Sequence, residues 1–252
     1  MKPTFGVLVG GAPLTLAGTP FTVACETDAA GLPTTPWGSA SALPQGIEQT
    51  HCRFIFLKRH GPSAKLAPDQ VNYRANIWLF EHLKVDGVIG THTVGGIDPD
   101  LDVGGLVVPD QLIDYTWGRP STFDDERRHI DFAQPYDRSL REALLVAMPG
   151  NQAEGLSHAF DGVYGITQGP RLETAAEIQR MARDGCSVVG MTGMPEAALA
   201  RELELAYASL CVVVNPAAGI GAAAEQVDME ALRAASHAGA QTIAGLLSQL
   251  QV

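Results

Sequence analysis

Arg59 and His60 are the first side chains along the sequence whose types suggest chemistry. They follow the apolar run 53–57, and an arginine and a histidine at the end of a strand can offer charge-assisted hydrogen bonds to a phosphate group. Residues 10–13, GGAP, follow the apolar run 5–9, and the amides of such a turn can also face an anion. A surface salt bridge and a plain structural turn are the respective alternatives.

Two further segments are denser in polar and small residues. Residues 167–174 read TQGPRLET, and residues 189–196 read VGMTGMPE. Together with RHG at 59–61 and NYRANIW at 72–78, they resemble the motifs of the trimeric purine nucleoside phosphorylase and methylthioadenosine phosphorylase family. The resemblance extends from about residue 57 to 215. The motifs GxGxxG and GxxxxGK[ST] are absent, which disfavours hydride transfer and nucleotide hydrolysis.

The family resemblance implies a phosphate site built from several segments of the chain. The expected phosphate-binding residues are Gly11, Arg59, His60, Thr93 and Thr192. Without the resemblance, Thr192 would be interpreted as a cap of the helix that begins near residue 195. The family pattern GG[ST]G places a hydroxyl in the first loop, whereas this chain has Ala12 and Pro13 there. We therefore expect weak phosphate binding.

The same resemblance implies contacts with the sugar. Met191 is similar to a methionine that packs below the ribose, and His129 is similar to a residue that closes the ribose pocket of a neighbouring subunit. Ordinary core packing and a solvent-facing loop are the alternatives for these two residues. His92 stands where the family often has threonine or asparagine, so it could replace the missing donor of the first loop or play no part in the site.

The base pocket is expected to contain Leu172, Glu173 and Asn215. Family members that cleave 6-aminopurine nucleosides have an aspartate where this chain has Asn215. An amide can donate to an O6 carbonyl and accept from N7–H, while Glu173 would accept from N1–H, which a 6-oxopurine has and adenine lacks. Both residues therefore indicate a 6-oxopurine such as hypoxanthine. Leu172 replaces an aromatic residue and loses ring stacking. A turn residue and a helix-start carboxylate are the alternatives for Asn215 and Glu173.

The pocket for the 5′ group of the sugar is expected near residues 226–228, with Val227 facing it. Family members that bind a 5′-hydroxyl have a histidine in this region, whereas the methylthio branch is apolar. A 6-oxopurine together with an apolar 5′ group describes 5′-methylthioinosine, which is the substrate that we expect.

The expected reaction is phosphorolysis, in which inorganic phosphate as co-substrate attacks C1′ of the nucleoside. Asn215, Arg59 and His60 are the expected catalytic residues, because they would stabilise the departing purine and hold the phosphate. Neither a metal nor an organic cofactor is implied. Three alternatives stay open: an inosine or guanosine phosphorylase, a catalytically weak nucleoside-binding homologue, and a nucleoside hydrolase, which is disfavoured because no aspartate cluster suggests a calcium site.

The periodicity of the chain indicates which elements hold these residues. Strands are predicted at 5–9, 53–57, 87–90, 162–166, 187–190 and 206–214, and helices at 71–83, 175–183, 196–204 and 228–250. Residues 25–46 are predicted to form loops with one edge hairpin, and 95–96 a turn. Such alternation predicts one three-layer α/β/α domain over residues 1–252 with a central mixed sheet. In these folds, ligands bind beyond the carboxyl ends of strands.

The composition limits the possible partners. The formal net charge of −11 excludes general attraction to nucleic acid or to an acidic membrane surface. Four dispersed cysteines without a CxxC pair predict neither disulfides nor a zinc site. The sequence shows no signal-peptide pattern and no long apolar run, so a cytoplasmic location is expected. The family resemblance implies a homotrimer, with a hexamer as the alternative.

Overall fold

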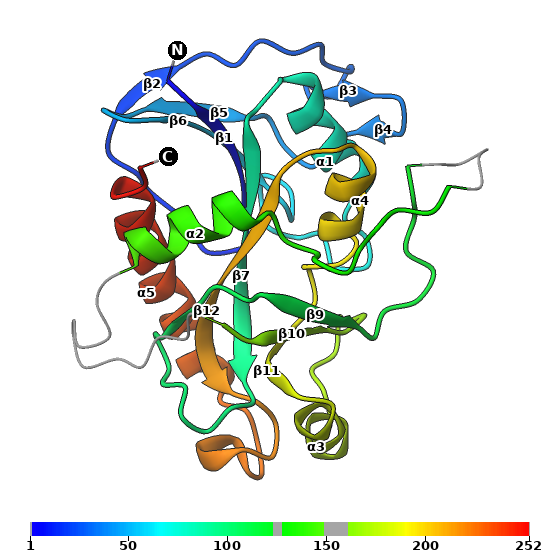
Figure 1. Cartoon of the computed structure of the whole chain (residues 1–252), viewed down its shortest axis with the longest axis vertical. Coiled ribbons are helices and arrows are strands. Elements are labelled where there is room, and N and C mark those ends of the chain that lie inside the picture. The colour runs from blue at the N-terminus through cyan, green and yellow to red at the C-terminus, as the bar shows by residue number, and fades with distance from the viewer. Residues whose placement is uncertain (1, 123–127, 149–160, 252) are drawn as a thin grey trace.

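The central feature of the fold is a ten-stranded mixed sheet (Figure 1). The computed structural model of the chain describes residues 2–122, 128–148 and 161–251. Strands follow the order β2-β5-β6-β1-β7-β11-β10-β9, and β12 pairs with β7 and with β8. Their bounds are β1 Thr4–Val9, β2 Thr19–Phe21, β5 Gln45–Glu48, β6 Arg53–Lys58, β7 Gly87–Gly96, β8 Leu106–Val107, β9 Gln111–Asp114, β10 Val163–Ile166, β11 Cys186–Gly190 and β12 Tyr207–Pro216.

Most strand pairs in the middle of the sheet are parallel, and the sequences of these strands have the apolar character typical of buried parallel strands. β1 runs parallel to β6 and β7, and β12 runs parallel to β7. A strand that is buried on both faces usually has a nearly continuous apolar sequence, and β1 and β12 have such sequences. β11 pairs with β7 in the antiparallel sense, so the sheet is mixed.

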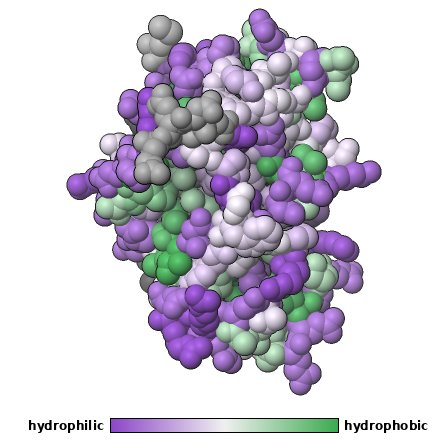
Figure 2. Space-filling view, turned by 90° about the vertical axis from the view of Figure 1, so that its right-hand side faces the viewer, coloured by the Kyte–Doolittle hydropathy of each residue, from purple (hydrophilic) through white to green (hydrophobic). Residues whose placement is uncertain are grey.

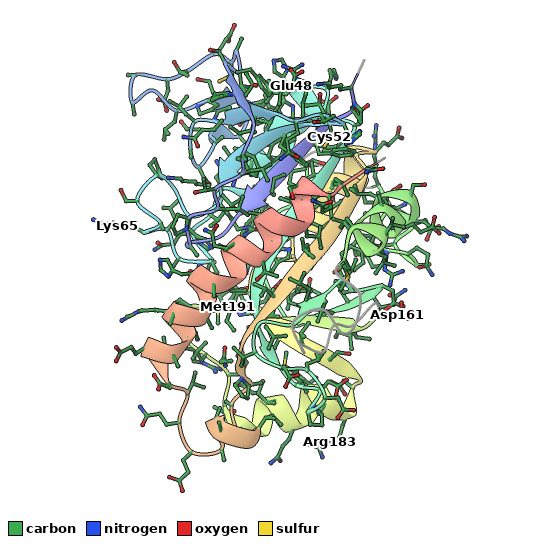
Figure 3. All side chains as sticks on the ribbon, turned by 90° about the vertical axis from the view of Figure 1, so that its left-hand side faces the viewer. Glu48, Cys52, Lys65, Asp161, Arg183 and Met191 are labelled. Atoms are coloured by element: carbon green, nitrogen blue, oxygen red, sulfur yellow. The ribbon has the colours of Figure 1, made fainter. Side chains whose placement is uncertain are left out.

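Helices cover both faces of this sheet. α2 (Arg138–Ala147) and α5 (Met229–Ser248) lie on one side, and Figure 3 shows α5 crossing the strands. α1 (Tyr73–His82) and α4 (Glu196–Glu202) lie on the other side, and α3 (Ala175–Arg183) follows β10. Phe5, Val7 and Val9 pack in the core cluster of α5, whereas Leu8 packs in that of α1. This alternation along β1 confirms the predicted three layers.

The helices α1, α2, α3 and α5 begin after residues whose side chains cap them. Asn72, Asp137 and Asp228 each accept a hydrogen bond from a backbone amide in the first turn of α1, α2 and α5. Thr174 and Glu177 form a reciprocal capping box at the start of α3. These caps fix the entrances of α3 and α5, and the loops before both helices contribute to the cavity described below.

The predicted elements are confirmed with small changes in their bounds, and one turn was wrong. β7 continues through Gly95 and Gly96, which were predicted to form a turn, because both residues pair with β11 and β12. A Cβ on Gly95 would lie only 3.2 Å from Val189, so glycine allows this close packing. The predicted hairpin exists as β3 (Thr34–Thr35) and β4 (Gly38–Ser39), but it forms a separate small sheet.

The surface mixes polar and apolar side chains. On the face shown in Figure 2, apolar residues form small separate groups among hydrophilic ones, a mixture common on folded domains. Within the described ranges, no helix has the length and apolar character needed to cross a membrane.

Candidate active site

A cavity of about 220 Å³ lies at the carboxyl end of β1, beside β7, β11 and β12. The polypeptide segments that line it are far apart in the sequence, as expected for a site built on the sheet of an α/β domain. Its lining includes the predicted residues Gly11, Arg59, His60, Thr93, Leu172, Glu173, Met191, Thr192, Asn215 and Val227.

Thr93 marks the floor of this cavity. It is the one exposed residue of β7 among nine buried neighbours in that strand. A central strand of a covered sheet normally buries every side chain, so the exposure of Thr93 comes from the cavity above it.

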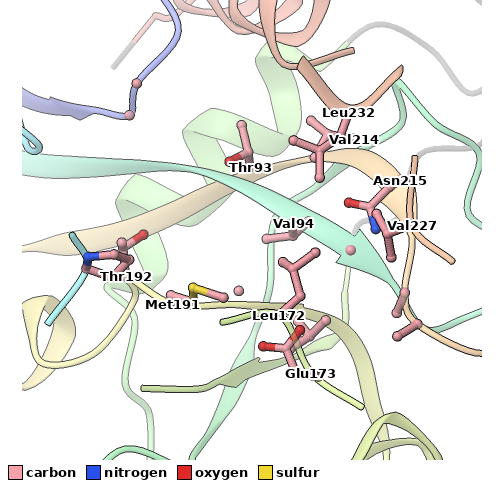
Figure 4. A pocket seen from close by; sticks show the side chains of 18 of the residues that line it. Thr93, Val94, Leu172, Glu173, Met191, Thr192, Val214, Asn215, Val227 and Leu232 are labelled. Carbon is pink, nitrogen blue, oxygen red and sulfur yellow. The ribbon is translucent and has the colours of Figure 1, made fainter. Parts of the chain in front are cut away.

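The cavity has two chemically different ends (Figure 4). Thr192 lies at one end, while Asn215 and Glu173 lie at the other, with Met191 and Val94 between them. Donors for an anion and groups that recognise a planar base are therefore separated by a largely apolar stretch.

Arg59 contributes to the first end, but its charge is matched within the protein. The guanidinium is 1% exposed and makes a two-pronged ion pair with Glu196, in which Nη2 lies 3.0 Å from Oε2. Nη1 donates to the carbonyl of Thr91 at 2.9 Å. Glu196 also accepts from the hydroxyl of Tyr207 at 2.9 Å. The positive potential that Arg59 sends into the cavity is therefore reduced by a buried carboxylate.

His60 is neutral in this environment. Burial and the nearby charge of Arg59 lower the pKa of His60 to about 4. Its Nδ1 lies 2.8 Å from the carbonyl oxygen of Leu66 and must donate to it. Nε2 consequently carries a lone pair and no proton, so the imidazole cannot donate to an anion.

Thr192 has a buried side chain whose oxygen lies 2.8 Å from Nδ1 of His92. The helix α4 that follows uses Pro195 as its N-cap residue and has no side-chain cap. Thr192 therefore does not cap α4, and the alternative interpretation of this residue as a helix cap is wrong.

Asn215 owes its orientation to an irregularity in β12. The pairing of β12 with β7 shifts between Val213, which opposes Val94, and Asn215, which opposes Gly95. Val214 is thus an extra residue in the ladder, and such a bulge breaks the alternation of side chains. Both Val214 and Asn215 consequently line the cavity.

The amide of Asn215 presents its oxygen to the cavity. Nδ2 donates to the carbonyl of Pro216 at 2.6 Å, and Oδ1 is turned toward the interior of the pocket in Figure 4. Opposite it, one carboxylate oxygen of Glu173 accepts from the hydroxyl of Thr167 at 2.5 Å. This bond orients Glu173 and leaves its second oxygen available to a ligand.

The first turn of α5 adds an apolar wall. Val227 precedes the N-cap Asp228, and Met229 and Leu232 follow at helical spacing on the side that faces the cavity. Sequence reasoning identified Val227 alone, although the spacing of Met229 and Leu232 after a capping aspartate could have revealed both.

Other residues of the site had no local signal in the sequence. Arg119 links three segments of the cavity wall, because it donates to Oε1 of Gln168 at 3.2 Å, to the carbonyl of Pro68 at 3.2 Å and to that of Met191 at 3.4 Å. The further lining residues to which sequence reasoning assigned no role are Pro68, Val94, Gly95, Val189, Gly190, Val214, Ala217 and Ala218. Gly10 also lines the cavity, in the turn at 10–13 whose amides can face an anion.

His129 is the one predicted site residue that this cavity does not include. It is exposed and lies in the stretch between β9 and α2. Within one chain it makes no part of the cavity wall. Among the residues described, no cluster of three or more His, Cys, Asp or Glu side chains could hold a metal ion.

Comparison with known proteins assigns this architecture to a family. Residues 16–251 match the model of the Phosphorylase superfamily. The chain belongs to this superfamily. A probable S-methyl-5′-thioinosine phosphorylase of Pseudomonas syringae pv. tomato is 52% identical over 189 residues, which cover 73% of this chain and 76% of that protein.

Two other known proteins extend the comparison. The 6-oxopurine nucleoside phosphorylase of Pyrococcus furiosus is 45% identical over 174 residues, covering 66% of this chain and 64% of that protein. The structure of methylthioadenosine phosphorylase from Schistosoma mansoni in complex with adenine aligns with a TM-score of 0.84 and 26% identity, over 98% of this chain and 90% of that chain. The predicted family and fold are confirmed.

Proposed function

We propose that this phosphorylase-superfamily member cleaves S-methyl-5′-thioinosine with inorganic phosphate, giving hypoxanthine and 5-methylthioribose 1-phosphate. One observation carries this proposal: a single cavity combines Asn215 and Glu173 at one place with the apolar wall of Val227, Met229 and Leu232. The relative from Pseudomonas syringae, at 52% identity, supports the same substrate.

The base would be recognised by complementary hydrogen bonds. Oδ1 of Asn215 would accept from N7–H of the departing purine, and the second Nδ2 proton can donate to O6. The unoccupied oxygen of Glu173 would accept from N1–H. Adenine offers an unprotonated N1 to this carboxylate, and a mismatch of this kind costs about 1–3 kcal/mol.

Phosphate would be bound mainly by neutral donors. The charge of Arg59 is matched by Glu196, and the His60 ring has no free proton. The hydroxyls of Thr93 and Thr192 and the amides near Gly11 would supply the contacts, while Arg59 adds a reduced positive potential. Ala12 and Pro13 offer no hydroxyl in the first loop. This set supports binding that is real but weak.

The reaction would proceed as the bond between C1′ and N9 breaks. Its electron pair moves onto the purine, which is stabilised as its N7-protonated form by Asn215, and a phosphate oxygen forms the new bond to C1′. Phosphate itself offsets the positive charge that develops on the sugar. The protein contributes positioning and fixed dipoles in a partly enclosed cavity.

Assembly is a further part of the proposal. We propose that His129 closes the ribose pocket of a neighbouring subunit in a cyclic homotrimer, as the family resemblance implies. Its exposed position outside the cavity of its own chain is compatible with this role.

The test is a phosphate-dependence assay with methylthioinosine, inosine, methylthioadenosine and adenosine. Phosphate-dependent release of hypoxanthine, fastest from methylthioinosine, is the expected result. Equal release of base without phosphate would instead indicate a hydrolase, and binding without turnover a nucleoside-binding protein. Inosine as the better substrate would favour a conventional 6-oxopurine nucleoside phosphorylase, a function that the relative from Pyrococcus furiosus makes the second candidate.

A further inference from the structure

His92 lies behind the phosphate end of the cavity. It contacts Thr192 of the cavity wall on one side and two buried hydroxyl groups on the other. The imidazole is 2% exposed, with Nδ1 2.8 Å from Oγ1 of Thr192. On its other side, Nε2 lies 3.2 Å from the hydroxyl of Ser209 and 3.3 Å from that of Tyr207. Both ring nitrogens therefore have partners, and one of the partners reaches the cavity.

The ring carries a single proton. Burial, followed by the nearby positive charge of Arg59, holds the pKa of His92 well below its usual range, so the imidazole is neutral. A neutral imidazole donates from one nitrogen and accepts at the other. Two arrangements of the chain of hydrogen bonds are consequently possible.

In the first arrangement, Nδ1–H donates to the oxygen of Thr192, and Nε2 accepts. The proton of Tyr207 is committed to Glu196, whose Oε2 lies 2.9 Å away. Ser209 is then the donor to Nε2. The hydroxyl proton of Thr192 remains free to point into the cavity.

In the second arrangement, Nε2 is protonated and Nδ1 accepts the proton of Thr192. The hydroxyl of Thr192 would then present only lone pairs to an anion, which is repulsive. A bound phosphate dianion therefore favours the first arrangement over the second.

Gly90 leaves the space that this chain of hydrogen bonds requires. Gly90 lies two residues before His92 on the same face of β7. A Cβ at Gly90 would lie 2.1 Å from the Tyr207 hydroxyl and 2.7 Å from Nε2 of His92. Any larger residue would displace one of these two groups, so glycine is required here for the buried cluster.

We propose that His92 is a positioning residue for phosphate: its Nδ1–H holds the oxygen of Thr192, so that the Thr192 hydroxyl donates to the anion, and Ser209 fixes the tautomer. This inference rests on the proposed phosphorolysis. It assigns a purpose to a buried histidine that the proposed reaction does not otherwise use.

Nitrogen NMR of protein labelled in its histidine rings tests the tautomer directly. With inorganic phosphate added and no nucleoside present, we expect the His92 signals to show a protonated Nδ1 and a bare Nε2. The signals are assigned by their loss in His92→Asn. A protonated Nε2 in the phosphate-bound protein would overturn the proposal.

Kinetics of variants test the consequence. His92→Leu removes the donor and should raise the phosphate KM about tenfold, the loss of one hydrogen bond, with a much smaller change in the nucleoside KM. His92→Asn places an amide nitrogen near the position of Nδ1 and should restore most of the affinity. In a Thr192→Val background, which has no hydroxyl to orient, His92→Leu should add little. Asparagine no better than leucine, or full additivity in the double variant, would overturn the proposal.

Ser209→Ala provides a milder test that keeps the imidazole in place. It should raise the phosphate KM by a smaller factor than His92→Leu and increase the Nε2-protonated tautomer. Unchanged tautomer populations would remove Ser209 from the proposal. Phosphate-dependent turnover by the wild-type protein is measured alongside, so failure of phosphorolysis itself is distinguished from failure of the His92 assignment.

Discussion

Nη2 of Arg59 lies 3.0 Å from Oε2 of Glu196, and both side chains are buried at the wall of the cavity. The residue expected to be the main cationic phosphate ligand is therefore also half of an internal ion pair. Loss of activity in Arg59→Ala would not separate these roles, because removing one partner of a buried pair costs about 3–5 kcal/mol of stability.

Glu196→Gln separates them. The substitution leaves the charge of Arg59 unmatched, so we expect the free energy of unfolding to fall while the phosphate KM decreases several-fold. Urea denaturation and initial-rate kinetics measure the two effects. Glu142→Gln is the control, because Glu142 forms an exposed surface pair with Arg138 and should change neither quantity noticeably. A higher phosphate KM in Glu196→Gln would contradict a role for the positive potential of Arg59.

Asn215→Asp should shift base preference toward 6-aminopurines. A carboxylate accepts from an amino group but cannot donate to O6, so binding of hypoxanthine should weaken by about tenfold or more relative to adenine. Calorimetry with the two free bases measures the ratio. An unchanged ratio would remove Asn215 from the base pocket.

Met229→Gln should reduce selectivity for the methylthio group. The new amide has nearly the shape of methionine but disfavours an apolar 5′ substituent and can hydrogen-bond a hydroxyl. We expect the ratio of kcat/KM for methylthioinosine to that for inosine to fall about tenfold. Met229→Leu, which keeps the wall apolar, is the matched control. Equal effects of the two substitutions would indicate that shape, and not polarity, determines the preference.

Activity should depend on assembly through His129. His129→Ala should raise the KM for the nucleoside, and a mixture of inactive variants altered in different parts of the shared site should regain activity on exchange of subunits. Sedimentation measured at assay concentrations gives the oligomeric state. A fully active monomer would contradict the shared pocket.

The buried imidazole of His92 should make the fold sensitive to acid. Its pKa is depressed in the folded protein by burial and by the nearby charge of Arg59, but is about 6.5 in the unfolded chain. Below that pH the unfolded state binds a proton that the folded state does not, so stability falls by about 1.4 kcal/mol per pH unit until the folded pKa is reached. In His92→Asn the free energy of unfolding should fall less steeply with decreasing pH, by this amount per pH unit, as measured by urea denaturation at several pH values.

The sequence predicted the fold well where the apolar periodicity of an element agreed with the residues that mark its ends. The run before Arg59 and the capped helix after Thr174 are local patterns, so their elements could be recognised without a structure. The turn predicted at 95–96 was wrong because glycine there serves close packing between strands, which is a tertiary effect.

The candidate site was predictable only in part. Sequence reasoning identified ten of the 21 residues that line the cavity, including Asn215 and Glu173. The pairing of Arg59 with Glu196 joins residues 137 positions apart, and the contacts of Arg119 join four segments. Such partners are determined by the packing of the sheet and its helices, so no local pattern in the sequence reveals them.

Thr93 lies on β7, and we expect this strand to open far more rarely than the rim of the cavity. β7 is hydrogen-bonded to β1, β11 and β12, so its amide protons should exchange with solvent only when the whole domain unfolds. Leu172 and Met229, by contrast, stand at the rim with 38% and 46% of their surfaces exposed, in the loop before α3 and the first turn of α5. If these two elements open locally, a nucleoside can enter without disturbing the floor, and the entry and exit of ligands are then kinetically independent of the geometry that holds the reacting atoms.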